Sequence, residues 1–247
     1  MTDLHKPWPI TRLLSIPVDC VSRTDLLAFV QSRVLARDQQ LHIVTMNAEM
    51  AHAATADPAL MAALQQADLI IPDGIGVVWA LGRQGIRVER LPGIELVQEL
   101  LRRSAEGQLK VGILGSSQTT LDQLEPVLTK RFGPVQRVYT RNGFFSPAER
   151  PGILADINAA APDVLFVALG VPRQELFIAE FRSQLQAPIL IGVGGSFDVI
   201  SGQLKRAPLW MQKAHLEWFY RLLQQPSRWR RMLALPLFVL QVTGFRP

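Results

Sequence analysis

At 247 residues, with 48% hydrophobic and 19% charged residues, the chain suits one large α/β domain and is far from the composition of a disordered protein. Its single cysteine, Cys20, excludes an internal disulfide, and no stretch approaches the roughly 20 apolar residues of a membrane-spanning helix. The net charge of +5 is uneven: residues 205–247 carry +7 and residues 1–204 carry −2, an asymmetry typical of proteins that meet phosphate-rich material through one region.

The first half of the chain alternates short apolar runs with helical patterns. Residues 13–20 predict a strand or an edge hairpin, and residues 24–36 predict a helix capped by Ser22 or Thr24. We expect a strand at 41–45, a helical stretch from there to about residue 67, and a second strand that stops at Asp73 and Gly74. Residues 93–107 have the amphipathic spacing of a helix that Gly107 ends.

The second half continues this alternation. Strands are expected at 110–117, 163–170 and 187–195, helices at 119–132 and 174–185, and a capping box at 146–149 begins another helix. The strands are rich in Val, Ile and Leu without alternating, which predicts an α/β fold with a Rossmann-like, mostly parallel sheet covered by helices on both faces. We expect residues 1–204 to form this body and residues 205–247 to form a basic, aromatic-rich helical appendage.

Small and polar residues stand at the carboxyl ends of the predicted strands. Ligands of open parallel sheets bind at this edge, so we expect these residues to face one crevice. They are Thr45, Asn47, Asp73, Gly74, Gly115, Gln174, Glu175, Gly194 and Asp198.

Each of these residues also has a structural interpretation. Asp73 is either a turn aspartate or a desolvated general base. Gly115 ends a turn that resembles a phosphate cradle, or only marks a strand-to-helix junction. Glu175 suits a helix N-terminus by charge alone. Gln174 lacks that reason, and its structural interpretation is a solvent-facing amide, the usual state of a glutamine. Asp198 either caps a helix or binds the hydroxyls of a sugar or ribose.

Several classes of site are missing from the sequence. The histidines lack zinc-ligand spacing, and neither a G-x-S-x-G elbow nor a Walker A motif is present, so no motif demands a metal. The aromatic residues of the basic segment suit either a helical pair packed on the body or an amphipathic element at an anionic bilayer. No nucleic-acid-binding motif appears, and we expect no nucleic-acid partner.

Six blocks of the sequence resemble the WecG/TagA/CpsF family of bacterial glycosyltransferases over roughly residues 12–235. The blocks are TMNAEM, ADLIIPDGIGVVWA, ERLPGIEL, GILGSS, LGVPRQELF and the stretch from GVGGSFDVISGQLKRAP to residue 232. The resemblance implies transfer of a hexose-type sugar from a UDP-sugar to an undecaprenyl-diphosphate-linked saccharide in cell-envelope or exopolysaccharide synthesis. N-acetylmannosamine, its uronic acid and glucose are the candidate sugars. It further implies an inverting, metal-independent reaction without a cofactor, at the inner face of the cell membrane.

The resemblance also implies roles for individual residues. Asp73 takes the place of the proposed base, with Thr45 and Asn47 lining the pocket beside it, and Arg90 matches a basic position. Gln174 and Asp198 match residues that hold the nucleotide sugar. The appendage would supply a cation to the leaving diphosphate, with Arg206, Arg221 and Arg228 as candidates.

Two other functions stay open on the sequence. The alternation of strands and helices with Gly115 also suits a nicotinamide-dependent oxidoreductase, although the glycine fingerprint is incomplete. The second open function is a non-enzymatic binding module that attaches to membrane or RNA through its basic segment. The sequence leaves the exact sugar, the strand order and a homo-oligomeric state undecided.

Overall fold

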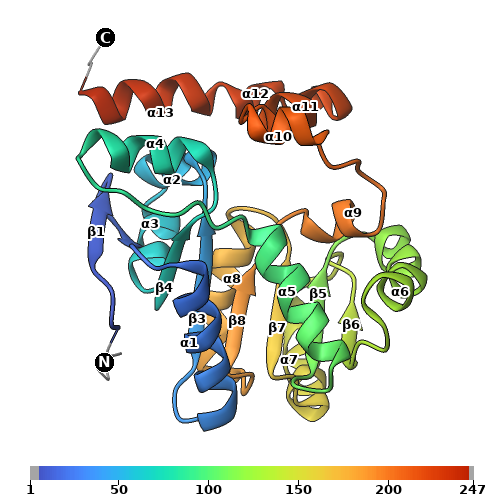
Figure 1. Cartoon of the computed structure of the whole chain (residues 1–247). Coiled ribbons are helices and arrows are strands. Elements are labelled where there is room, and N and C mark those ends of the chain that lie inside the picture. The colour runs from blue at the N-terminus through green and yellow to red at the C-terminus, as the bar shows by residue number, and fades with distance from the viewer. Residues whose placement is uncertain (1–5, 245–247) are drawn as a thin grey trace.

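The computed structural model describes residues 6–244, apart from the side chain of Arg230, and contains a six-stranded parallel sheet between layers of helices (Figure 1). The strands lie in the order β4-β3-β8-β7-β5-β6, and each neighbouring pair is parallel. They are β3 Leu41–Met46, β4 Leu69–Pro72, β5 Val111–Gly115, β6 Arg137–Arg141, β7 Val164–Ala168 and β8 Ile189–Gly192. The predicted fold class is confirmed.

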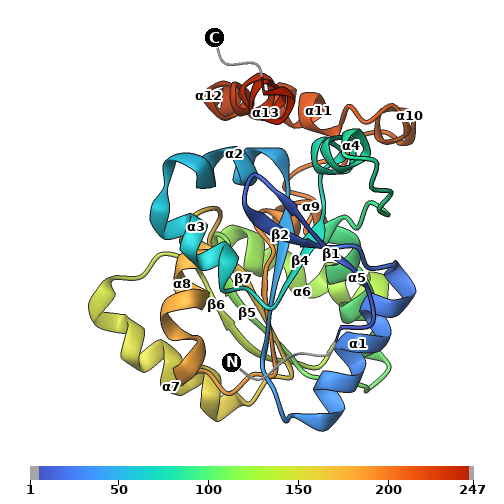
Figure 2. The same ribbon diagram turned by 90° about the vertical axis from the view of Figure 1, so that its left-hand side faces the viewer.

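Helices cover both faces of the sheet (Figure 2). One face packs against α1 Arg23–Ala36, α5 Gly93–Ala105, α6 Gln118–Phe132 and α9 Ser196–Ile200. The other packs against α2 Ala48–Ala56, α3 Pro58–Gln65, α4 Ile75–Arg83, α7 Arg150–Ala160 and α8 Arg173–Phe181. Successive strand residues point to opposite faces, so Ile189 and Ile191 enter the first layer and Leu190 the second. Burial on both sides explains the continuous apolar runs.

Several local predictions are confirmed. Residues 13–20 belong to an antiparallel hairpin outside the main sheet, formed by β1 Ile10–Leu13 and β2 Ile16–Asp19. Ser22, rather than Thr24, caps α1 by accepting a hydrogen bond from the backbone N–H of Asp25 at 3.1 Å. The capping box at 146–149 is present, and it opens a 3-10 turn (Pro147–Glu149) that leads into α7. A second 3-10 turn, Arg182–Gln184, follows α8.

The helical stretch after β3 is two helices rather than one. Asp57 ends α2 and caps α3, because its carboxylate accepts the backbone N–H groups of Ala59 and Leu60. Pro58 follows at the first position of α3, where its fixed φ is suited to a helix start. The periodicity of apolar residues continues across this junction, which is why the sequence pattern alone merged the two helices.

The C-terminal segment is helical and runs across the molecule above α2, α4 and the strand ends (Figure 1). Its elements are α10 Leu209–Lys213, α11 Glu217–Gln224, a 3-10 turn Pro226–Arg228, α12 Trp229–Met232 and α13 Ala234–Thr243. Phe238 of α13 is 1% exposed and belongs to the same apolar cluster as α2 and α4, so this helix packs into the body. The predicted boundary at residue 205 between the body and the appendage stays a prediction. Residues 1–5 of the predicted body and 245–247 of the predicted appendage lie outside the described residues.

Candidate active site

A cavity of about 350 Å³ lies between the carboxyl ends of four neighbouring strands and the C-terminal segment. Residues in or after β4, β3, β8 and β7 form its sheet side, and the turn before α10 together with α11 and α12 supplies much of the remaining lining. Ten of the predicted site residues line it: Thr45, Asn47, Asp73, Gly74, Arg90, Gln174, Gly194, Arg206, Arg221 and Arg228.

Thr45 and Asn47 occupy the end of β3. The Thr45 hydroxyl donates to the Gly192 carbonyl at 3.2 Å, which ties β3 to β8. Asn47 caps α2 through its side-chain oxygen, which accepts the Met50 N–H at 2.9 Å. No described residue hydrogen-bonds its amide nitrogen, so this N–H₂ group is available to a bound molecule.

Asp73 follows β4 and is partly buried. Its Oδ1 accepts the backbone N–H of Gly93 at 2.6 Å, whereas Oδ2 receives no hydrogen bond from any described residue. Burial raises the pKa of Asp73 to about 6, and the charge of Glu217 raises it further, against the lowering effects of the Gly93 N–H, Arg90 and Arg221. A carboxylate with a pKa near 6 and one free oxygen has the properties of a general base.

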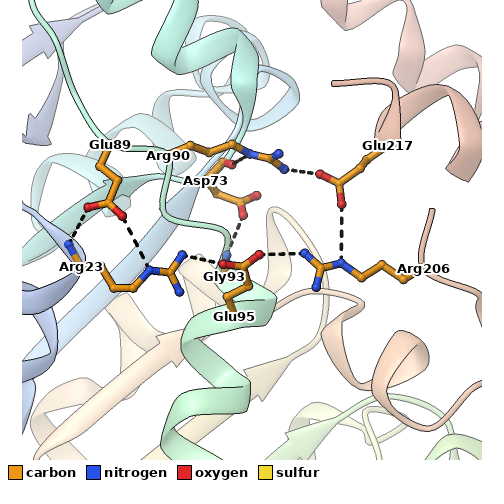
Figure 3. A network of polar contacts seen from close by, with 8 residues as sticks. All are labelled: Arg23, Asp73, Glu89, Arg90, Gly93, Glu95, Arg206 and Glu217. Carbon is orange, nitrogen blue, oxygen red and sulfur yellow. Dashed lines mark hydrogen bonds and ion pairs between the residues drawn. The ribbon is translucent and has the colours of Figure 1, made fainter. Parts of the chain in front are cut away.

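A chain of alternating charges crosses the wall of the cavity (Figure 3). Arg90 donates from Nε to the Asp73 carbonyl at 2.9 Å and from Nη2 to Glu217 at 2.5 Å. Arg206 donates to Glu95 at 2.8 Å, and its Nε lies 3.8 Å from Glu217. The chain therefore joins the C-terminal segment to the body on one side of the cavity.

Gln174 and Glu175 form a buried polar pair below the cavity, 1% and 0% exposed. The Gln174 oxygen accepts the N–H groups of Gly170 and Gly194, and its amide donates to Glu175 at 2.7 Å. Burial raises the pKa of Glu175 to about 7, and its second oxygen has no described hydrogen-bond partner. Gln174 therefore cross-links the loops after β7 and β8, and its oxygen is already occupied.

The three candidate arginines differ in their partners. Arg206 pairs with Glu95 and Glu217, and Arg228 lies 3.5 Å from Glu49. Among the residues that the structure describes, Arg221 has no acidic partner, and its buried Nε has no hydrogen-bond partner. Burial lowers the pKa of Arg228, and the nearby charges of Arg221 and Arg231 lower it further, against the raising effect of Glu49. An anion bound between these guanidinium groups would be stabilised.

Three predicted site residues do not line the cavity. Gly115 ends β5, and this strand lies beyond β7 in the sheet. Glu175 lies beneath the cavity, where it holds Gln174. Asp198 lies in the first turn of α9, and its Oδ1 accepts the hydroxyl of Thr120 at 3.0 Å. These three positions therefore do not contribute to the lining of this cavity, and their expected roles in the site stay predictions.

Sequence reasoning did not assign four charged residues of the cavity to the site: Glu49, Lys205, Glu217 and Arg231. Glu217 bridges toward two arginines, and Glu49 pairs with Arg228 and Arg231. Glu217 stands out in the sequence as the single acid among residues 205–247, but that pattern alone gives it no role in the site. Glu49 and Arg231 have no comparable signal, since each is an ordinary charged residue on a helix.

The C-terminal helices expose several large apolar side chains. Leu209 is 74% exposed, Trp210 65% and Leu223 60%. Within residues 6–244, no helix has the length and apolar content needed to cross a bilayer. Over the same part of the chain, no three His, Cys, Asp or Glu side chains are grouped so as to hold a metal ion.

Comparison with known proteins relates the chain to one family of enzymes. The model of the "Glycosyl transferase WecG/TagA/CpsF family" matches residues 11–246. The chain is 35% identical over 220 residues to the N-acetylglucosaminyldiphosphoundecaprenol N-acetyl-beta-D-mannosaminyltransferase of Bacillus spizizenii (strain ATCC 23059 / NRRL B-14472 / W23), covering 89% of this chain and 85% of the relative. It is 33% identical over 229 residues to the protein of the same name from Bacillus subtilis (strain 168), covering 92% and 89%.

Proposed function

This chain belongs to the WecG/TagA/CpsF family of glycosyl transferases, and we propose that it transfers N-acetylmannosamine from a UDP-sugar to undecaprenyl-diphosphate-linked N-acetylglucosamine. The names of both relatives support this sugar and this acceptor over the uronic acid and glucose. The main structural support is one cavity that holds Asp73, with an oxygen to which no described residue donates a hydrogen bond, and Arg221, which has no acidic partner in the described part of the chain. Family membership favours a transferase over an oxidoreductase or a binding module.

Asp73 is the proposed general base. Its Oδ2 takes the proton of an acceptor hydroxyl as that oxygen attacks the anomeric carbon of the sugar. The hydrogen bond from the Gly93 N–H fixes the carboxylate through Oδ1 and leaves Oδ2 without a hydrogen bond from any described residue. The carbon–oxygen bond to UDP breaks in the same displacement, so the configuration at the anomeric carbon inverts.

Arg221 is the proposed cation for the leaving diphosphate. Negative charge grows on UDP as it departs, and a pre-positioned guanidinium stabilises this charge more in the transition state than in the ground state. The pairing of Arg206 and Arg228 with carboxylates makes them weaker candidates for this role. In this proposal no step requires a metal ion.

The other lining residues are proposed to bind substrate. Thr45, Asn47, Gly74 and Gly194 shape the sheet side of the cavity, and Gln174 fixes the loop that bears Gly194. A Cβ at Gly74 would lie 3.0 Å from the Asn47 Cβ, so the small residue lets the two strand ends approach. Binding roles for Gly115 and Glu175 stay predictions from their positions at strand ends, and the role of Asp198 stays a prediction that the resemblance supports.

The direct test is release of UDP from UDP-N-acetylmannosamine in the presence of a short-chain lipid-diphosphate N-acetylglucosamine acceptor. We expect UDP release to depend on the acceptor, to continue in EDTA and to give a β-linked product by NMR. A panel with the uronic acid and glucose donors tests the choice of sugar. Acceptor-independent hydrolysis, or an α-linked product, would contradict the proposal.

We further propose that the C-terminal segment places the enzyme on the inner face of the cell membrane. Exposed apolar side chains at Leu209, Trp210 and Leu223 combine with the positive charge of residues 205–247, and this combination is typical of an interfacial element at an anionic bilayer. Lipid at this surface would bring the acceptor diphosphate to the cavity beside it.

Point substitutions test this membrane contact better than removal of the segment, because Phe238 of α13 belongs to the core. We expect Trp210→Ser with Leu223→Ser to reduce sedimentation with phosphatidylglycerol vesicles while UDP release from a water-soluble acceptor continues. Phe144→Ser is the matched control, since Phe144 is 78% exposed and follows β6, the edge strand of the sheet, rather than belonging to the C-terminal segment. Equal sedimentation of both variants would contradict the proposed surface.

A further inference from the structure

Glu217 is an acid at a position where an acid is unexpected. Residues 205–247 contain eight Lys and Arg, and Glu217 is their single acidic residue. Its side chain is 26% exposed and lines the cavity. A carboxylate there repels a diphosphate substrate, so some other interaction must account for its place.

Glu217 forms an ion pair with the guanidinium group of Arg90. The Nη2 of Arg90 donates to Glu217 Oε2 at 2.5 Å, and Arg206 approaches Oε1 to 3.8 Å from the other side (Figure 3). Arg206 is held in turn by Glu95 of α5 at 2.8 Å. The Glu217 carboxylate therefore lies between two cations, which neutralise it within the cavity.

Without Glu217, the Arg90 guanidinium would be able to pair with the Asp73 carboxylate and so compete with the acceptor hydroxyl for it. Its Nε already donates to the Asp73 carbonyl at 2.9 Å, so the guanidinium lies beside residue 73. Arginine and carboxylate form short, paired hydrogen bonds when both are free. Such a pair would cover Oδ2 of Asp73 and lower its affinity for a proton. In the structure Oδ2 receives no hydrogen bond from a described residue, and Arg90 binds Glu217 instead.

We propose that Glu217 is a positioning residue that holds Arg90 off the Asp73 carboxylate and so keeps Oδ2 free for the acceptor hydroxyl. The inference rests on the proposed role of Asp73 as the base. The charged groups that act on Asp73 are Arg90, Glu217 and Arg221, and only Glu217 among them raises the pKa of Asp73. Loss of the Glu217 charge therefore lowers the pKa of Asp73, and a turn of Arg90 onto the Asp73 carboxylate lowers it as well.

The test measures the protonation of Asp73 directly. The ¹³C resonance of its carboxyl group, assigned by its loss in Asp73→Asn, is titrated in the full-length protein, in Glu217→Gln and in Glu217→Asp. We expect Glu217→Gln to lower the midpoint by about one pH unit and Glu217→Asp, which retains the charge, to restore most of it. Glu95→Gln is the control, because it loosens Arg206 without touching Arg90, and it should leave the midpoint in place.

Kinetics then connect this effect to turnover. The acid limb of kcat/KM for UDP release should move down with the carboxyl midpoint in Glu217→Gln, and kcat should fall at least tenfold at pH 8. An unchanged Asp73 midpoint in Glu217→Gln overturns the inference, as does an equal shift in Glu95→Gln. If Asp73→Asn keeps full activity, the proposed base is wrong, and the carboxyl titration still decides the role of Glu217. Glu217→Ala removes the same charge and provides the comparison should Glu217→Gln fold poorly.

Discussion

Replacing Asp73 with Asn should abolish activity and stabilise the fold in the same variant. The two side chains have the same shape, and the Asn oxygen can still accept the Gly93 N–H that Asp73 now accepts at 2.6 Å. The substitution removes only the charge and the proton-accepting oxygen. General-base catalysis typically contributes 10²- to 10⁴-fold, so kcat should fall by about that factor, or about 3–5 kcal/mol in barrier.

The stability effect follows from the raised pKa. A carboxyl that goes from 3.8 to about 6 on folding binds its proton more tightly in the folded state. It therefore stabilises the fold below about pH 4, and this contribution is lost as the pH rises through 6. The shift corresponds to about 3 kcal/mol, at about 1.4 kcal/mol for each pH unit. At pH 8 Asp73→Asn should be more stable than the wild type by up to this amount, and at pH 4 the difference should disappear.

Two assays check this prediction. Urea unfolding at pH 4 and pH 8 gives the free energies of unfolding, and the pH profile of UDP release gives the active protonation state. For the wild type, kcat/KM should rise with a midpoint near pH 6 and be roughly tenfold below its plateau at pH 5. The reasoning is refuted if Asp73→Asn keeps more than a tenth of the activity, or if its stability relative to the wild type is the same at both pH values.

Three further substitutions test other parts of the structure. Arg221→Ala should lower kcat by about 10²- to 10³-fold in UDP-release assays. Lys213→Ala, on α10 and outside the cavity, is the control and should not lower kcat. A larger loss in Arg228→Ala would assign the stabilisation of the leaving diphosphate to Arg228 instead. His42 is 1% exposed, both of its ring nitrogens lack described partners, and burial lowers its pKa to about 3. The free energy of unfolding of the wild type should therefore fall by up to about 5 kcal/mol as the pH falls from about 6.5 to 3. Urea unfolding should not find this loss in His42→Leu. Gly192→Ala should destabilise the fold by about 1–3 kcal/mol in thermal unfolding, because its Cβ would lie 2.6 Å from Gln174 Nε2 and 2.8 Å from Glu175 Oε1. Gly152→Ala, with open space around its Cβ on α7, is the matched control and should not destabilise.

The sequence was sufficient for five of the six strands of the sheet and for the location of its ligand edge, but it did not predict β6 or the division of α2 from α3. Strands buried on both faces require unbroken apolar runs, so β7 and β8 were evident from composition alone. Ser22 and the capping box at 146–149 mark helix starts through contacts three residues apart, which a local pattern contains. Asp73 stood out because a carboxylate after a buried strand is placed at the edge where ligands bind.

Tertiary structure decided which of these residues meet. The strand order puts β5 beyond β7, so Gly115 ends outside the cavity although its turn resembles an anion site. Asp198 follows a strand as predicted, but α9 lies against α6, and its carboxylate accepts a hydroxyl from Thr120 there. Neither outcome is visible from spacing, because strand order depends on how whole layers pack.

The charged residues of the site were also only partly predictable from the sequence. The sequence showed a basic C-terminal segment, yet it did not distinguish Arg206, Arg221 and Arg228 from one another. Arg90 and Glu217 are separated by 127 residues, and only the docking of α11 above the strand ends brings their charges together. Local pattern fixes which residues stand at the ends of strands and helices, since those rules act over a few positions. The pairing of charges, and hence which arginine has no acidic partner, depends on long-range packing, and only the folded structure defines it.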